Sequence, residues 1–250
     1  MPDLPLSLAL GFGIGVSLGL LGGGGSILTV PALVYIIGQT PQAAVPTSLA
    51  IVGANSALGA YFHNNQGSLN WKVALVFGGA GMGTAYLAAG LSGLFTPAAL
   101  LVLFAVLMIV ISAVMLLRLK GVEQNDKQAS WPVVVTAGAG VGLLTGILGV
   151  GGGFLIVPAL VMLVGLPMYQ AVGTSLVIIA ATSLAGFIGH LGANLFDLPL
   201  TLVFVASGLT GTYAGSRLAK RMPAQRLRQI FAVFVLLLAI YLLADNLPKL

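Results

Sequence analysis

The chain contains one sixteen-residue stretch twice, first as GLLGGGGSILTVPALV (Gly19–Val34) and again as GILGVGGGFLIVPALV (Gly146–Val161). Each copy joins a run of glycines to an apolar segment with a Val-Pro-Ala-Leu motif. Glycine leaves the backbone unrestrained and proline lacks an N–H donor, so both interrupt regular helices. The stretch therefore predicts a break between two helices, and its recurrence predicts two such breaks.

The similarity extends outward from this stretch over most of the chain. A shift of 127 residues superposes Pro46-Thr47-Ser48-Leu49 on Gly173-Thr174-Ser175-Leu176, and His63 on His190, without a gap. Self-similarity at a fixed period indicates repeated structural units. We predict a first repeat at 1–117, a cytoplasmic linker at 118–131 and a second repeat at 132–250.

The composition excludes an ordinary soluble protein. Of the 250 residues, 58% are hydrophobic and only 6% are charged, so polar groups are too few to cover a water-exposed surface. A helix needs about 20 apolar residues to cross a hydrocarbon core of about 30 Å. The length therefore allows about eight to ten crossings and no separate soluble domain. The first apolar run lacks the features of a signal peptide, and we expect it to be retained.

Each repeat contains five apolar segments bounded by glycine, proline or charge. They run at about 6–21, 26–38, 41–63, 73–91 and 97–117, and then at about 132–149, 153–165, 167–191, 199–216 and 225–247. At 1.5 Å per residue the first two segments of each repeat are too short to cross the hydrocarbon core. We therefore expect an all-α integral membrane protein whose glycine-rich helix breaks lie within the bilayer.

The basic residues predict how the repeats are oriented. The formal net charge is +5, but the basic residues are not interleaved with aromatic ones, which argues against a nucleic-acid partner. Five basic residues, Arg217 among them, follow the fourth segment of the second repeat, whereas the matching loop of the first repeat carries none. Because basic loops stay in the cytoplasm, this loop and the linker are expected inside. Two inverted repeats satisfy these assignments, as in many secondary carriers.

The glycine runs are the first candidate binding site. Consecutive glycines before a helix leave N–H groups free at its positive end, where anions bind. Close helix packing is the alternative explanation, because small residues let membrane helices approach one another. The candidate residues are Gly22, Gly23, Gly24, Gly25 and Ser26 in the first repeat and Gly149, Gly151, Gly152 and Gly153 in the second.

Polar residues of the third segment of each repeat are the second candidate. Ser48 and Asn55 share one helical face, and Ser175 and Thr182 repeat that face in the second copy. We expect two facing polar stripes near the bilayer midplane, unless each hydroxyl bonds back to its own helix. The predicted hydrogen-bond donors are Thr47, Ser48, Asn55, Thr174, Ser175 and Thr182.

His63 and His190 occupy equivalent positions and are candidates for proton coupling. Each lies about 23 residues along its segment, near the far surface, so an interfacial or packing role is the alternative. The chain has no cysteine, which excludes disulfides and thiolate metal sites. We expect no cofactor, no metal and no catalytic residue.

The glycine run, Val-Pro-Ala-Leu and (Pro/Gly)-Thr-Ser-Leu, present once per repeat, resemble the TauE/SafE family of sulfite exporters and toluene sulfonate uptake permeases. The resemblance spans nearly the whole chain. It implies a multi-pass carrier of the prokaryotic cytoplasmic (inner) membrane for sulfite, sulfonates or related anions, commonly driven by an ion gradient. Pro46 in place of the usual glycine and Val150 inside the second glycine run depart from the pattern, so the two half-sites need not be equivalent and the pocket can be asymmetric.

Together these features predict a secondary transporter that moves sulfite, thiosulfate or an organosulfonate by alternating access, with a proton or sodium as the coupling ion. An anion channel and a carrier of small carboxylates are the alternatives. An intramembrane enzyme that pairs a serine with a histidine is disfavoured, because no acidic residue lies inside a segment to orient the imidazole. The sequence leaves the direction of transport and the oligomeric state open.

Overall fold

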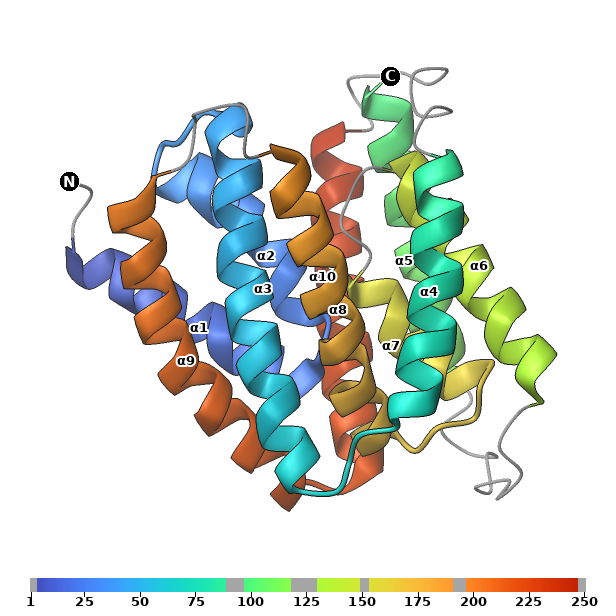
Figure 1. Ribbon diagram of the computed structural model, residues 1–250. Coiled ribbons are helices and arrows are strands. Elements are labelled where there is room, and N and C mark those ends of the chain that lie inside the picture. Colours follow the sequence, from blue (N-terminus) through green and yellow to red (C-terminus); the bar gives the residue numbers. More distant parts are fainter. Residues whose placement is uncertain (1–3, 89–96, 118–129, 149–152, 191–196, 247–250) are drawn as a thin grey trace.

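The computed structural model describes residues 4–88, 97–117, 130–148, 153–190 and 197–246, which form helices joined by short connections (Figure 1). This confirms the predicted all-α fold. The predicted segments agree to within three residues, except α9, where the helix continues past the apolar segment through basic residues. The elements are α1 (Leu4–Leu21), α2 (Gly24–Pro31), the π-helical turn η1 (Ala32–Ile36), α3 (Pro41–Asn65), α4 (Trp71–Ala88), α5 (Pro97–Leu117), α6 (Trp131–Leu148), α7 (Gly153–Met162), α8 (Met168–His190), α9 (Leu198–Arg221) and α10 (Ala224–Asn246).

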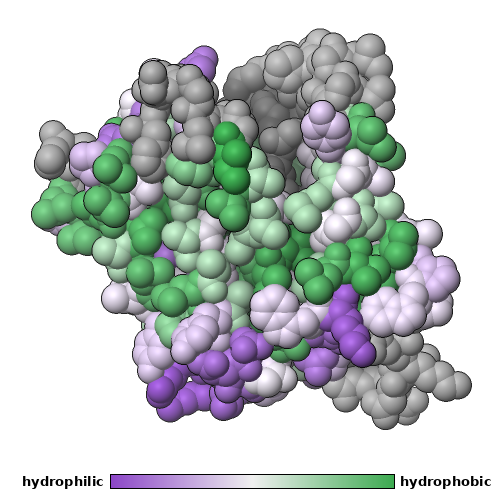
Figure 2. Space-filling view, in the orientation of Figure 1, coloured by the Kyte–Doolittle hydropathy of each residue, from purple (hydrophilic) through white to green (hydrophobic). Residues whose placement is uncertain are grey.

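Five of the described helices are long and apolar enough to cross a membrane, by length and composition: α1, α3, α8, α9 and α10. The apolar stretches Gly24–Ile36 and Gly153–Met162 are shorter than a crossing requires. Figure 2 shows apolar side chains across the middle of the molecule and hydrophilic ones gathered toward its lower end. The chain is thus a multi-pass membrane protein, and the expectation of eight to ten crossings stays a prediction.

The 127-residue shift found in the sequence also relates the observed elements. Helices α1, α3, α4 and α5 begin at residues equivalent to the first residues of α6, α8, α9 and α10. The two short helices end alike: the N–H of Ile37 donates to the Ala32 carbonyl at 3.1 Å, and that of Val164 donates to the Ala159 carbonyl at 3.2 Å. The two copies therefore share local structure as well as sequence.

The first helix of each repeat packs on the fourth helix of the other, so that α1 lies on α9 and α6 on α4. Gly15 approaches Gly208 so closely that a Cβ on Gly15 would lie less than 3.0 Å from the Gly208 carbonyl oxygen. The equivalent pair, Gly142 and Gly81, makes the same approach. Small residues allow such close helix contacts in membranes. Because the first helices are exchanged, the two repeats are intertwined.

Helices α3 and α8 pack together and run in opposite directions (Figure 1). Gly173, near the start of α8, lies against His63 at the end of α3, whereas Gly186, near the end of α8, lies against Leu49 near the start of α3. Since α3 and α8 are equivalent helices, this antiparallel course is the one that inverted repeats require. The inversion of the complete repeats stays a prediction.

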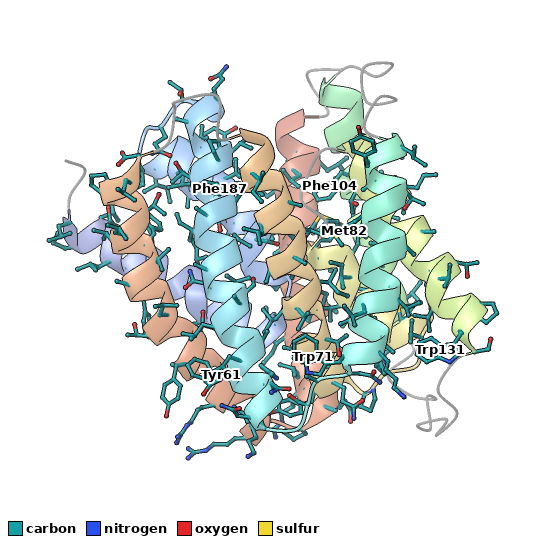
Figure 3. All side chains as sticks on the ribbon, in the orientation of Figure 1. Tyr61, Trp71, Met82, Phe104, Trp131 and Phe187 are labelled. Atoms are coloured by element: carbon teal, nitrogen blue, oxygen red, sulfur yellow. The ribbon has the colours of Figure 1, made fainter. Side chains whose placement is uncertain are left out.

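Aromatic side chains mark one end of the molecule. Tyr61, Trp71 and Trp131 lie toward the lower end in Figure 3, and each is at least half exposed. Tyrosine and tryptophan favour the membrane–water interface. The basic C-terminal turn of α9, with Lys220 and Arg221, lies at the same end (Figure 1). This is the end that the positive-inside rule predicts to face the cytoplasm.

Candidate functional site

The first glycine run forms the junction between α1 and α2. Gly22 has a φ of 75°, a left-handed conformation that glycine adopts readily. The N–H of Gly22 donates to the Leu18 carbonyl at 2.9 Å, and that of Gly23 donates to the Leu21 carbonyl at 3.0 Å. These two N–H groups therefore close the end of α1. The N–H groups of Gly24, Gly25 and Ser26 begin α2 and have no acceptor within that helix.

The start of α2 meets the start of α7. A Cβ on Gly23 would lie less than 3.0 Å from the carbonyl oxygen of Gly153, the first residue of α7. A Cβ on Gly153 would in turn crowd the Ser26 hydroxyl. All three residues are buried or half-buried. Two helix N-termini thus lie side by side inside the bundle. The other predicted glycines of the second run, Gly149, Gly151 and Gly152, lie outside the described residues.

The first glycine break also contacts the Thr-Ser pair of the second repeat. A Cβ on Gly22 would lie 2.5 Å from Ser175 Oγ and 3.2 Å from Val172 Cα, both on α8. Thr174 and Ser175 are fully buried. The structure therefore brings Gly22, Gly23, Ser26, Gly153 and Ser175 together at one place.

The other Thr-Ser pair, Thr47 and Ser48, lies elsewhere. Thr174 and Ser175 directly follow Gly173, which faces His63 near the end of α3. Thr47 lies sixteen residues before His63 on α3, and at 1.5 Å per residue this separation is about 24 Å. Asn55 and Thr182 lie between these two levels. The predicted polar residues thus follow the α3–α8 pair as a line across the bundle and do not form a single cluster.

Most of the predicted hydroxyl donors bond back to their own backbone, as the alternative interpretation held for each of them. Such a hydroxyl has already used its hydrogen and offers only lone pairs to a ligand. Thr174 differs, because its Oγ1 accepts from the N–H of Asn70 at 3.1 Å. The back-bonded donors are Ser26 to Gly23 O (2.7 Å), Ser48 to Val45 O (2.8 Å), Ser175 to Val172 O (2.8 Å) and Thr182 to Ile179 O (3.1 Å).

Asn55 keeps its hydrogen-bonding groups free. It is fully buried, and neither Nδ2 nor Oδ1 has a partner. Its amide lies against Gly208 of α9, and a Cβ on residue 208 would overlap the Asn55 amide nitrogen. Thr47 Oγ1 is likewise buried without a partner. An unsatisfied buried polar group costs about 1–3 kcal/mol, so a ligand or water is expected to engage it.

In the described part of the chain, four further buried hydroxyls without a partner were not among the predicted site residues, those of Ser7, Ser17, Ser56 and Thr212. Thr212 packs through Cγ2 against Gly59, one helical turn along the same α3–α9 contact that holds Asn55 and Gly208. Ser56 has a signal in the sequence, because it aligns with Ser183 in the other repeat. Thr212 has no local motif around it, and only the packing of α9 on α3 places it here.

His63 is fully buried, although it lies near the end of α3 as its position in the sequence predicts. Its Nδ1 lies 2.8 Å from Ser68 Oγ and its Nε2 lies 3.5 Å from the Gly19 carbonyl oxygen. The ring of Tyr169 lies 5.1 Å away. His190 is the last residue of α8, and its side chain lies outside the described residues.

At the lower end of the molecule, Arg217 lies over the ring of Tyr213 at 5.0 Å, and that ring packs edge-on against Phe62 at 5.2 Å. Arg217 is exposed, in agreement with its predicted position at the end of a crossing. Among the residues with described positions, no group of three or more His, Cys, Asp or Glu side chains comes together.

Comparison with known proteins gives a consistent result. The family model described as Sulfite exporter TauE/SafE matches residues 7–242. A probable membrane transporter protein of Xylella fastidiosa (strain 9a5c) is 33% identical over 248 residues, covering 96% of this chain and 95% of the relative. One from Methanocaldococcus jannaschii is 26% identical over 255 residues, covering 96% and 95%. The Bacillus subtilis (strain 168) protein YdhB is 27% identical over 218 residues, covering 85% and 89%.

No solved structure matches the chain. The family match nonetheless covers all but the two ends of the sequence, and the relatives align over nearly their full lengths with it. The relatives are described as membrane transporters, which fits the long apolar helices. This chain belongs to the TauE/SafE family of membrane transporters.

Proposed function

We propose that the protein is a secondary transporter that moves a small sulfur-containing anion across the prokaryotic cytoplasmic membrane by alternating access. Sulfite, thiosulfate and organosulfonates are the substrate candidates, and an ion gradient drives the movement. The observation that carries the proposal is the meeting of two helix N-termini at Gly23 and Gly153. The family description supports the substrate class.

The paired N-termini supply positive potential without a charged side chain. Each helix N-terminus carries about half an elementary positive charge, and its first N–H groups point outward to a ligand. Gly24, Gly25 and Ser26 contribute such groups from α2, and Gly153 begins α7. Glycine at these positions lets the backbone approach the anion closely.

Neutral donors suit a site that must empty on each cycle. Helices α1, α2, α3, α7 and α8 contain no Lys, Arg, Asp or Glu. A buried cationic side chain would hold an anion more tightly, but it would be costly to leave unpaired after release. Asn55 and Thr47 have free hydrogen-bonding groups, and we assign them to the path on which the anion moves to and from the glycine breaks.

The intertwined packing supports moving units that combine both repeats. Helix α1 is held to α9 and α6 to α4 by glycine contacts, whereas α3 and α8 cross at the centre. We propose that the α1–α9 pair and the α4–α6 pair tilt about the central α3–α8 pair. Each tilt opens one end of the line of polar residues and closes the other.

An anion channel is the second candidate, and the line of polar side chains over about 24 Å of α3 favours it. A carboxylate carrier would use the same neutral donors. An enzyme is disfavoured even though His63 and Ser68 lie within hydrogen-bonding distance, because the Ser68 hydroxyl donates to the His63 carbonyl oxygen at 3.0 Å. No carboxylate on α1, α3 or α8 is available to orient the imidazole.

Reconstitution into liposomes tests the proposal. A proton or a sodium gradient is imposed, and the uptake of sulfite, thiosulfate, a short sulfonate and a short carboxylate is followed in separate experiments. We expect saturable uptake of at least one sulfur anion above that of empty liposomes. Uptake of the carboxylate alone would contradict the substrate class, and a large unitary conductance in planar bilayers would favour the channel.

A further inference from the structure

The surroundings of His63 contain more hydrogen-bond acceptors than a neutral imidazole can satisfy. With the Ser68 hydroxyl donating to the His63 carbonyl oxygen at 3.0 Å, Ser68 Oγ accepts from His63 Nδ1 at 2.8 Å. On the other side of the ring, Nε2 faces the carbonyl oxygen of Gly19 at 3.5 Å. A neutral imidazole donates from one nitrogen only, whereas the protonated ring donates from both. The geometry therefore has a place for a second proton on Nε2.

The groups that face His63 leave that proton without a counter-charge. Helices α1, α3 and α8 and the residues 66–70 contain no Asp or Glu. The titratable neighbour is Tyr169, whose hydroxyl donates to Gln66 Oε1. The basic residues of the adjoining helices are all exposed, Lys72 on α4 and Arg217, Lys220 and Arg221 on α9. A buried imidazolium in this position is stabilised only if an anion comes close to it.

The proposed anion site lies close along the chain to both glycines that lie against His63, Gly19 on α1 and Gly173 on α8. Gly19 precedes Gly22 by three residues on α1, and Gly173 precedes Ser175 by two residues on α8. Gly22 and Ser175 are themselves in contact. An anion held there supplies the counter-charge that the imidazolium lacks. By thermodynamic reciprocity, the proton must then strengthen anion binding by the same factor.

Gly19 also links the proton to the shape of the glycine break. It belongs to the last turn of α1, where the Leu18 and Leu21 carbonyls hold the N–H groups of Gly22 and Gly23. A Cβ on Gly19 would lie less than 3.0 Å from the Thr212 carbonyl oxygen, so α9 closes off that side of the turn. A new Nε2–H donor draws the Gly19 carbonyl toward α3 and moves the turn that carries Gly22.

We propose that His63 takes up the coupling proton together with the anion, which makes the protein a proton–anion symporter. The inference rests on the proposed function, because the anion at the glycine breaks is the counter-charge. It assigns the role to His63 and not to its equivalent His190, because the position that matches Ser68 is Leu195, whose side chain has no hydrogen-bond acceptor.

Two measurements on His63→Gln, with His190→Gln as the matched control, test this assignment. In proteoliposomes, a proton gradient should accumulate sulfite in wild type and His190→Gln but about tenfold less in His63→Gln, within the range of typical coupling free energies. Size-exclusion chromatography of His63→Gln in detergent checks that the variant is folded. Equal accumulation in wild type and His63→Gln, or a loss confined to His190→Gln, would overturn the assignment.

The second measurement does not depend on flux. The chain has no cysteine, so a single Leu20→Cys reports on the last turn of α1. The rate of thiol labelling rises with pH for any accessible cysteine, because the thiolate is the reactive form. Each rate in proteoliposomes is therefore divided by the rate of the Leu20→Cys, His63→Gln double variant at the same pH. We expect this ratio to change as the pH is lowered. If no anion moves but the ratio depends on pH, the proposed function fails and the His63 switch stands. If the ratio is independent of pH while sulfite moves, the switch fails alone.

Discussion

Gly23 lies so close to Gly153 that a Cβ on Gly23 would come within 3.0 Å of the Gly153 carbonyl oxygen. The contact joins the first glycine break of one repeat to the first helical residue of the matching short helix in the other. It explains why glycine is needed at Gly23, where φ is negative and other residues would otherwise be allowed. It also makes the proposed anion site depend on both repeats at once.

Replacing Gly23 with alanine should disturb this contact. The added methyl group has backbone and not a flexible side chain as its neighbour, so the two breaks must move apart, at about 1–3 kcal/mol. We expect a lower melting temperature in detergent and loss of sulfite uptake. Gly13→Ala is the control, because a Cβ on Gly13 meets nothing within 4 Å. Wild-type uptake by Gly23→Ala would remove the contact from the mechanism.

The intertwined packing predicts equal effects in the two repeats. Gly15→Ala should force α1 away from α9, and Gly142→Ala should force α6 away from α4, because each new Cβ meets the partner backbone. We expect each to lower the stability by about 1–3 kcal/mol, measured as the melting temperature in detergent. The matched controls are Gly13→Ala and Gly140→Ala, which are equivalent to one another and lie in open space. Destabilisation by only one of the two test variants would show that the repeats do not share this packing.

Asn55 should show opposite effects on stability and on transport. Asn55→Leu replaces an unpartnered buried amide with an apolar group of similar size, and we expect the protein to gain about 1–2 kcal/mol of stability. The same change removes a free donor from the proposed path, so sulfite uptake should fall. Ser48→Ala is the control, because the Ser48 hydroxyl is already bonded to Val45 and its loss should change uptake little. Full uptake by Asn55→Leu would exclude the amide from the path.

Equivalent residues should lie on opposite sides of the membrane if the repeats are inverted. Thr40 and Pro167 are related by the 127-residue shift, both are exposed, and they precede α3 and α8. Because α3 and α8 are antiparallel, we expect Thr40→Cys to react with an impermeant thiol reagent from outside whole cells. Pro167→Cys should react only after the cells are opened. Labelling of both variants from the same side would contradict the inversion.

The helix boundaries could be predicted because their signals are local. Proline begins α3 and α5 at Pro41 and Pro97, and the glycine runs separate the short helices from the first ones. The end of α9 was placed five residues too early, because the charges from Arg217 onward end an apolar segment but not a helix. Lysine and arginine have good helix propensity and suit the negative C-terminus of a helix.

The exchange of the first helices could not be predicted, because nothing in the neighbourhood of Gly15 identifies Gly208 as its partner. The sequence also could not distinguish the hydroxyls that have no hydrogen-bond partner from those that bond to their own helix. Thr47 and Ser48 are adjacent and both buried, yet only Ser48 bonds back to its helix. Side-chain rotamers and packing decide which of the two hydroxyls has its hydrogen free for a ligand, and the sequence pattern reveals neither the rotamers nor the packing.

Sulfite counterflow in proteoliposomes tests the central claim most directly. Vesicles loaded with unlabelled sulfite, with no ion gradient, are diluted into labelled sulfite, and the internal label is followed over time. If the paired helix N-termini form a carrier site that opens to one side at a time, labelled sulfite will accumulate transiently and saturate with concentration. Entry of label that is linear in concentration and unaffected by internal sulfite would contradict the account.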